Sequence, residues 1–182
     1  MIRLRASTVE DVRAVAAWIR TEADLRTWSG STFRWPLEVE QLRAYVTEAP
    51  DRHRLMWTAV PDPEAPRPDQ PRPDRVVLGH ASLALTPDGT AGRLGRILVD
   101  PDRRGRGLGR AMVTSAVAAA FAQTRIAALT LGVYRQNTAA RRLYEGLGFT
   151  TTAVLEGVTT VGDEAWDAIE MALPRDRFAL AD

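Results

Sequence analysis

The feature that most constrains this chain of 182 residues is a glycine- and arginine-rich turn at residues 104–110, Arg-Gly-Arg-Gly-Leu-Gly-Arg. Residues 96–99 before it are typical of a short strand, and residues 111–122 after it carry apolar side chains at helical spacing. Glycine lets the backbone approach a ligand, and the first N–H groups of a helix have no intrahelical partner. Arginines at 103, 104, 106 and 110 add positive charge. The turn predicts a polyphosphate site; the alternative is an ordinary strand–turn–helix connection whose glycines permit tight packing.

The spacing of this turn excludes two common phosphate-binding motifs. A Walker loop needs a lysine, and all 24 basic residues of the chain are arginines. The dinucleotide fingerprint starting at Gly105 would need a third glycine where Arg110 stands. What remains is Arg-x-x-Gly-x-Gly, formed by Arg104, Gly107 and Gly109. This pattern resembles the acyl-coenzyme A motif of the GNAT superfamily of N-acetyltransferases, whose backbone amides cradle the coenzyme pyrophosphate.

A second motif lies in residues 137–149, Asn-x-x-Ala-x-x-x-Tyr-x-x-x-Gly-Phe, after a strand-like segment at 127–133. It resembles the second signature of the same superfamily. There the Asn position hydrogen-bonds the pantetheine arm, and the Tyr position protonates the departing thiolate. Each residue also has a structural alternative. Asn137 is a natural helix N-cap, and Tyr144 is placed to pack on a helix beside core residues Leu143 and Leu147.

The resemblance covers most of Leu94 to Pro174, including a last strand at 167–174. It implies an α/β fold with a mixed, mostly antiparallel central sheet and helices on both faces. It also implies acetyl-CoA as cosubstrate, with direct attack of a primary amine on the thioester in a ternary complex. The residues implied to bind the coenzyme are Ile97, Leu98, Val99, Arg104, Gly105, Arg106, Gly107, Leu108, Gly109, Arg110 and Asn137, and the implied catalytic acid is Tyr144.

The chain departs from the pattern at the general base. Relatives that acetylate ribosomal-protein N-termini carry glutamate five residues before the Asn, where this chain has Gly132. Two routes stay open: water relays the proton to one of three carboxylates, or the amine arrives deprotonated. Those carboxylates are Glu22, Asp24 and Glu156. The missing base also leaves open a non-catalytic acyl-CoA-binding or sensor module. A cysteine acyl-enzyme is excluded because the chain has no cysteine.

One stretch of the sequence indicates an acceptor site. Trp28, Phe33 and Trp35 lie in a stretch at 21–36 that we predict to be irregular. They would form an apolar wall or a cation–π surface for the acceptor, and Glu22 and Asp24 would attract a cationic amine. The alternative is that the three aromatics fasten this stretch onto the core.

Composition and charge limit which other partners and ligands we expect. A net charge of +1 provides no overall attraction to nucleic acid or membrane, so the arginines at 103–110 form a local cluster. The two histidines have no nearby cysteine or carboxylate cluster, so no metal site is predicted, and His80 is interpreted as a strand residue rather than a base. We expect a cytoplasmic protein whose partner is a small-molecule or peptide amine, with no nucleic acid and no membrane. The oligomeric state stays open, a homodimer included.

The expected organisation is one domain over 1–182, with a flexible proline-rich loop at 61–75 and a tail at 175–182. Strands are predicted at 2–6, 54–60, 76–85, 94–99, 127–133, 151–158 and 165–173. Helices are predicted after a capping box at 7–10 and at 37–49, 111–122 and 137–145. The order β-α-α-β-β-β-α-β-α-β-β is that of the superfamily.

Overall fold

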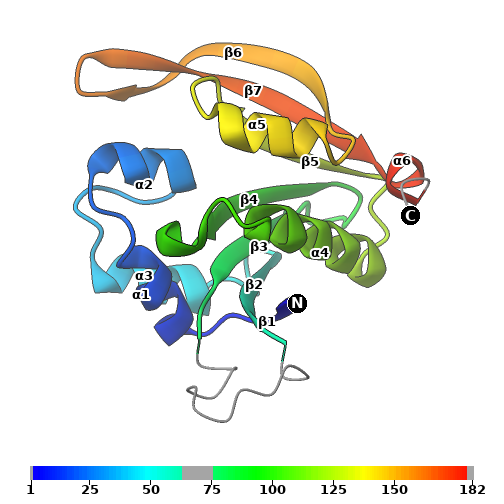
Figure 1. The fold of residues 1–182 in the computed structure, drawn as a ribbon, viewed down its shortest axis with the longest axis horizontal. Helices are drawn as coiled ribbons and strands as arrows, with labels where there is room; N and C mark the ends of the chain where they lie inside the picture. Colours follow the sequence, from blue (N-terminus) through cyan, green and yellow to red (C-terminus); the bar gives the residue numbers. More distant parts are fainter. Residues whose placement is uncertain (1, 63–75, 180–182) are drawn as a thin grey trace.

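A seven-stranded sheet organises the computed structural model, which describes residues 2–62 and 76–179 (Figure 1). The strand order is β1-β2-β3-β4-β5-β7-β6, and every neighbouring pair is antiparallel except β4 and β5. The strands are β1 (Ile2–Ala6), β2 (Arg54–Pro61), β3 (Gly79–Leu85), β4 (Gly92–Val99), β5 (Ala128–Tyr134), β6 (Thr150–Val161) and β7 (Glu164–Pro174). The helices are α1 (Val9–Ala16), α2 (Glu22–Ser29), α3 (Val39–Thr47), the short 3-10 helix η2 (Pro101–Arg103), α4 (Leu108–Gln123), α5 (Thr138–Glu145) and α6 (Arg175–Ala179).

The sheet divides between its two parallel strands. β4 and β5 pair only at Gly92 with Leu129 and at Arg93 with Thr130, near the start of each strand. Figure 1 shows β1 to β4 on one side of this division and β5, β7 and β6 on the other, with α2 at the open end. Beyond Arg93, the edge of β4 that faces β5 therefore has no strand partner in the described part of the chain.

Helices cover both faces of the sheet, as neighbouring residues of β3 show. His80 faces Tyr45 of α3 and Trp28 of α2, whereas Ala81 and Leu83 lie in the same buried cluster as α4. The predicted mixed α/β fold with helices on both faces is confirmed. In the described residues, no helix is both long enough and apolar enough to cross a membrane.

The predicted irregular stretch at 21–36 was wrong in its first half, because residues 22–29 form α2. Thr21 caps this helix: its side chain accepts from the backbone N–H of Asp24, and the Asp24 carboxylate accepts from the backbone N–H of Thr21. Leu25 and Trp28, three residues apart, lie on its buried face. Packing of these two side chains stabilises a helix of only two turns.

Two smaller differences concern the ends of elements. The first helix is capped one residue later than expected, by Thr8 and Asp11, because the Asp11 carboxylate reaches the Thr8 N–H at 2.8 Å. Residues 175–179, part of the expected tail, form α6, where Arg175 donates to backbone carbonyls at the end of α4, Phe121 among them. Most of the proline-rich segment 61–75 lies outside the described residues.

Candidate active site

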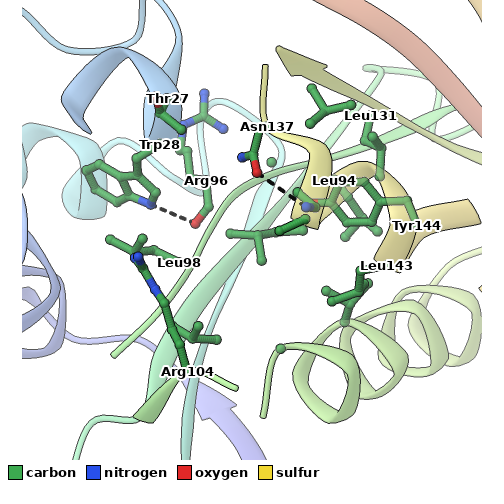
Figure 2. Close-up of a pocket in the computed structure, with 18 of the residues that line it drawn as sticks. Thr27, Trp28, Leu94, Arg96, Leu98, Arg104, Leu131, Asn137, Leu143 and Tyr144 are labelled. Atoms are coloured by element: carbon green, nitrogen blue, oxygen red, sulfur yellow. Dashed lines mark hydrogen bonds between the residues drawn. The ribbon is translucent and has the colours of Figure 1, made fainter. Parts of the chain in front are cut away.

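A cavity of about 740 Å³ opens where β4 and β5 separate (Figure 2). Its wall is formed by α2, β4, the glycine-rich turn, the start of α4, β5 and α5. The volume is within the range of small-molecule and cofactor sites. Figure 2 shows Trp28 and Arg96 on one side of it and Asn137 and Tyr144 on the other.

The glycine-rich turn leaves its backbone open toward the cavity. Gly105 and Gly107 have φ of 76° and 77°, and a Cβ on either would point into open space. Gly107 is also the N-cap of α4, so the unpaired N–H groups of the first helical turn begin here. Both glycines line the cavity together with Arg104 and Arg110. Positive φ and an open backbone are features that only glycine combines without strain.

The other predicted coenzyme-binding residues divide into two groups. Ile97, Leu98, Val99, Gly109 and Asn137 line the cavity as well. Arg106 and Leu108 are outside its lining, and Leu108 packs instead against a small buried cluster that includes Met112. Arg110 donates to the Gly146 carbonyl at 3.2 Å and so ties the start of α4 to the end of α5.

A bulge in β4 presents this strand to the cavity. The register with β3 shifts between His80 and Ser82, and Arg96 has a positive φ of 51°. The indole Nε1 of Trp28 donates to the Arg96 carbonyl at 2.9 Å, which fixes the bulge from α2. Residues 97–99 follow directly, on a strand edge that lacks a β5 partner, so their backbone groups can bond a ligand.

Tyr144 provides a protonated hydroxyl at the cavity. Its side chain is 8% exposed, and its ring meets Phe149 edge-on at 5.9 Å between centroids. Burial raises the pKa of Tyr144 to about 12. Within the described chain, no residue hydrogen-bonds its hydroxyl. The group therefore remains a proton donor throughout the neutral range.

Asn137 caps α5, and it lines the cavity at the same time. Its side-chain oxygen accepts from the Ala140 N–H at 3.3 Å, the contact dashed in Figure 2. The capping alternative is therefore observed, but capping occupies only the oxygen of the amide. Its NH₂ group has no partner among the residues that the structure describes.

An ion pair lies beside Gly132, the position at which the expected general base is missing. Arg93 of β4 and Glu170 of β7 meet across β5 at Gly132, with Arg93 Nη2 donating to Glu170 Oε1 at 2.7 Å. A Cβ on Gly132 would collide with Arg93 Nη2 and lie 2.9 Å from Glu170 Oε1. Sequence reasoning missed this pair, because its members are 77 residues apart and no local pattern joins them.

A second cavity, of about 380 Å³, adjoins the first on the face covered by α2. Both cavities are lined by Trp28, Leu94, Gly95, Arg96 and Gly132. The second is completed by residues 29–32 after α2, by Arg93 and Glu170, and by the β6 residues Leu155, Val158 and Thr159. The two cavities therefore meet at the point where the sheet divides.

The predicted acceptor residues lie in different surroundings. Trp28 lines both cavities, and Phe33 is buried behind it, stacked at 5.2 Å. Trp35 is 42% exposed and lines neither cavity. Asp24 lines the larger cavity, but its carboxylate caps α2, and Glu22 pairs with Arg26 at 3.1 Å.

Glu156, the third candidate for a proton relay, is exposed on β6 outside both linings. His80 is a residue of strand β3, as predicted, and it is fully buried.

The fold is shared with solved N-acetyltransferases. The spermidine N-acetyltransferase of Vibrio cholerae, solved with CoA and spermine, superimposes with a TM-score of 0.79 over 98% of both chains, at 16% identity. A putative phosphinothricin N-acetyltransferase superimposes with a TM-score of 0.74 over 96% of this chain and 98% of the other, at 17% identity.

The chain belongs to the acetyltransferase (GNAT) family, whose model matches residues 22–149. It is 29% identical to the peptidyl-lysine N-acetyltransferase YjaB of Salmonella typhimurium over 84% of this chain and 86% of that protein. It is 40% identical to the [ribosomal protein bS18]-alanine N-acetyltransferase of Escherichia coli K12 over 43% of this chain and 52% of that protein. The family predicted from the two motifs is confirmed.

Proposed function

We propose that this enzyme binds acetyl-CoA in the larger cavity and transfers the acetyl group to a primary amine that enters through the smaller one. The proposal rests mainly on one observation: a single cavity is lined by the glycine-rich turn, the unpaired edge of β4 and Tyr144 with its hydroxyl. Transfer is direct, within a ternary complex, because the chain has no cysteine to form a thioester intermediate.

The residues present fit an acyl-coenzyme A. The open backbone at Gly105 and Gly107 leaves room for a pyrophosphate at the start of α4, with Arg104 and Arg110 beside it. The free amide of Asn137 and the backbone of residues 97–99 suit the polar pantetheine arm. When bound, the coenzyme supplies an acetyl group already activated as a thioester.

The chain contributes two kinds of group to the chemistry. Backbone N–H groups on the unpaired edge of β4 would stabilise negative charge on the carbonyl oxygen, and they need no reorganisation because the strand already fixes them. Tyr144 would protonate the leaving thiolate, a role that its raised pKa keeps available at neutral pH. No carboxylate extends from position 132, so the amine would arrive already in its neutral form. The proton that it loses after attack would pass to solvent, from which Tyr144 would regain the proton that it gives to the thiolate.

Replacing Gly107 tests the coenzyme site. A valine there would be strained at φ of 77° and would direct its side chain into the cavity, so Gly107→Val should lose measurable acetyl-CoA binding in calorimetry. Gly89→Val is the matched control, because Gly89 also has a positive φ of 68° and open space but lines neither cavity. Unchanged affinity in a folded Gly107→Val protein would contradict the proposal.

Release of coenzyme A in the presence of a panel of primary amines tests the transfer itself. The wild-type protein should release thiol only when an amine is present. A protein that binds acetyl-CoA but acetylates no amine in the panel would instead be a binding or sensor module.

A further inference from the structure

The charges in the smaller cavity do not balance. Three charged side chains line it: Arg93, Arg96 and Glu170. Arg93 and Glu170 neutralise each other in the ion pair across Gly132. No carboxylate within residues 2–62 or 76–179 lies within ion-pair distance of Arg96. One positive charge is therefore left at the place where we propose that the acceptor enters.

The Arg96 guanidinium is held by neutral groups alone. It donates to Thr32 Oγ1 at 2.8 Å and to Ser82 Oγ at 3.2 Å, and it lies 5.4 Å from the centre of the Tyr45 ring. Its Nε is buried and has no hydrogen-bond partner. A partly buried cation without a counter-ion is costly, so such a group is normally matched by an anion.

The backbone at Arg96 is also constrained in a way that fixes the side chain. The residue occupies the β4 bulge with φ of 51°, and Trp28 holds its carbonyl. A positive φ is unfavourable for arginine and persists where the surroundings enforce it. Because Arg96 lines both cavities, an anion bound to its guanidinium in the smaller cavity would lie in the space that adjoins the proposed coenzyme site.

We infer that Arg96 binds a carboxylate of the acceptor, so that the substrate of this enzyme is an amine that itself carries a carboxylate. The inference rests on the proposed function and adds the chemical class of the acceptor. The apolar part of such a molecule would contact Trp28, Leu155 and Val158, which line the same cavity. A polyamine, which carries only positive charge, would be repelled by Arg96.

The absence of a base at position 132 favours an α-amine. An α-amino group in a peptide has a pKa of about 7.7–8.0, whereas the lysine side-chain amine has a pKa of about 10.4. The difference between these two pKa values makes the neutral, nucleophilic fraction near neutral pH roughly several hundred times larger for the α-amine than for the lysine amine. An enzyme without a base gains most from a peptide N-terminus, and one with an acidic side chain close to it would also satisfy Arg96. In a free amino acid the neighbouring carboxylate raises the pKa of the amine and reduces this gain.

Binding of product-like pairs tests the inference without requiring turnover. The probes are N-acetylglycine, N-acetyl-leucine and N-acetyl-glycyl-aspartyl amide, each compared with the same molecule in which a carboxamide replaces the carboxylate, by calorimetry on the protein loaded with coenzyme A. At least one carboxylate should bind about 10- to 100-fold more tightly than its amide, as expected for a hydrogen bond to a charged group. Equal binding of every pair, or no measurable binding of any of them, would overturn the inference.

Variants then assign the preference to Arg96. Arg96→Gln should abolish it, and Arg96→Lys should retain part of it, because lysine keeps the charge but not the planar donor pair. Arg54→Gln is the matched control: Arg54 lies 4.7 Å from the centre of the same Tyr45 ring but lines neither cavity, so the preference should survive. A preference unchanged in folded Arg96→Gln would refute the assignment.

The same measurements separate this inference from the proposed function. Tight binding of coenzyme A and release of thiol with amines, but without any carboxylate preference, would leave the proposed function standing and remove the inference. Failure of the wild-type protein to bind coenzyme A would remove both. If Arg96→Gln does not fold, the wild-type preference and its reduction in Arg96→Lys or in Thr32→Val, which removes a guanidinium partner, support the assignment, and an unchanged preference in both variants refutes it.

Discussion

Replacing Tyr144 with phenylalanine should slow catalysis strongly while leaving both the fold and coenzyme binding intact. The hydroxyl has no partner in the described structure, and the ring keeps its place against Phe149, so the free energy of unfolding should change by less than about 1 kcal/mol. Proton donation by a positioned acid contributes about 10²–10⁴-fold. That factor corresponds to about 2.7–5.4 kcal/mol of activation free energy, which should appear as a lower kcat.

Three measurements on the same Tyr144→Phe protein decide this prediction: thiol release for kcat, calorimetry for the acetyl-CoA dissociation constant, and thermal unfolding. We expect only kcat to change. Equal losses of affinity and kcat, or a lower melting temperature with normal kcat, would show that Tyr144 only packs. The pH profile adds a check. Because burial raises the pKa of Tyr144 to about 12, the side chain stays protonated at lower pH, and kcat should not fall there through loss of its proton. A decline near pH 10, about the ordinary tyrosine pKa, that disappears in Tyr144→Phe would refute the reasoning.

Three further predictions concern the base, the aromatic residues and the buried histidine. Because Gly132 provides no carboxylate, kcat/KM should rise about tenfold per pH unit up to the pKa of the acceptor amine, and a plateau that begins well below that pKa would contradict this. Trp28→Ala should raise the acceptor KM and lower the unfolding free energy by about 3–5 kcal/mol, whereas exposed Trp35→Ala should change neither. Burial and the charge of Arg96 lower the pKa of His80 to about 3, below its unfolded value of 6.5. Below pH 6.5 the unfolded state therefore binds a proton that the folded state does not, and the unfolding free energy should fall by about 1.4 kcal/mol per pH unit down to about pH 3. Urea denaturation across this range should show a smaller slope in His80→Gln, and an unchanged slope would count against the assignment.

The glycine-rich turn and the helix after it could be predicted because their determinants are local. A turn that needs positive φ, followed at once by a helix, is encoded in adjacent residues, and the structure gives Gly105 and Gly107 this conformation. The seven strands were predictable for the same reason, since each is formed by a short run rich in apolar or β-branched residues. Tyr144 and Asn137 share one short helix, so their spacing along the chain also fixes their relation in space.

Helix α2 was missed because its local signals conflict. Thr21 and Asp24 form a capping box, yet the aromatic residues and Gly30 that follow are typical of an irregular loop. The helix depends on burial of Leu25 and on the bond from Trp28 to the Arg96 carbonyl. That carbonyl belongs to a strand 68 residues further along the chain, so local sequence could not reveal the contact.

The acceptor site illustrates the limit of the sequence most clearly at Gly132. The chain alone showed that a base was missing there, but it could not show that the space is filled from two other strands. A side chain at position 132 would displace the ends of Arg93 and Glu170, so glycine leaves room for the ion pair at this position. Among the described residues that line the smaller cavity, Glu170 has the only carboxylate, and its pairing with Arg93 leaves Arg96 as the unbalanced charge. Loss of the base and preference for an anionic acceptor are thus two consequences of one arrangement.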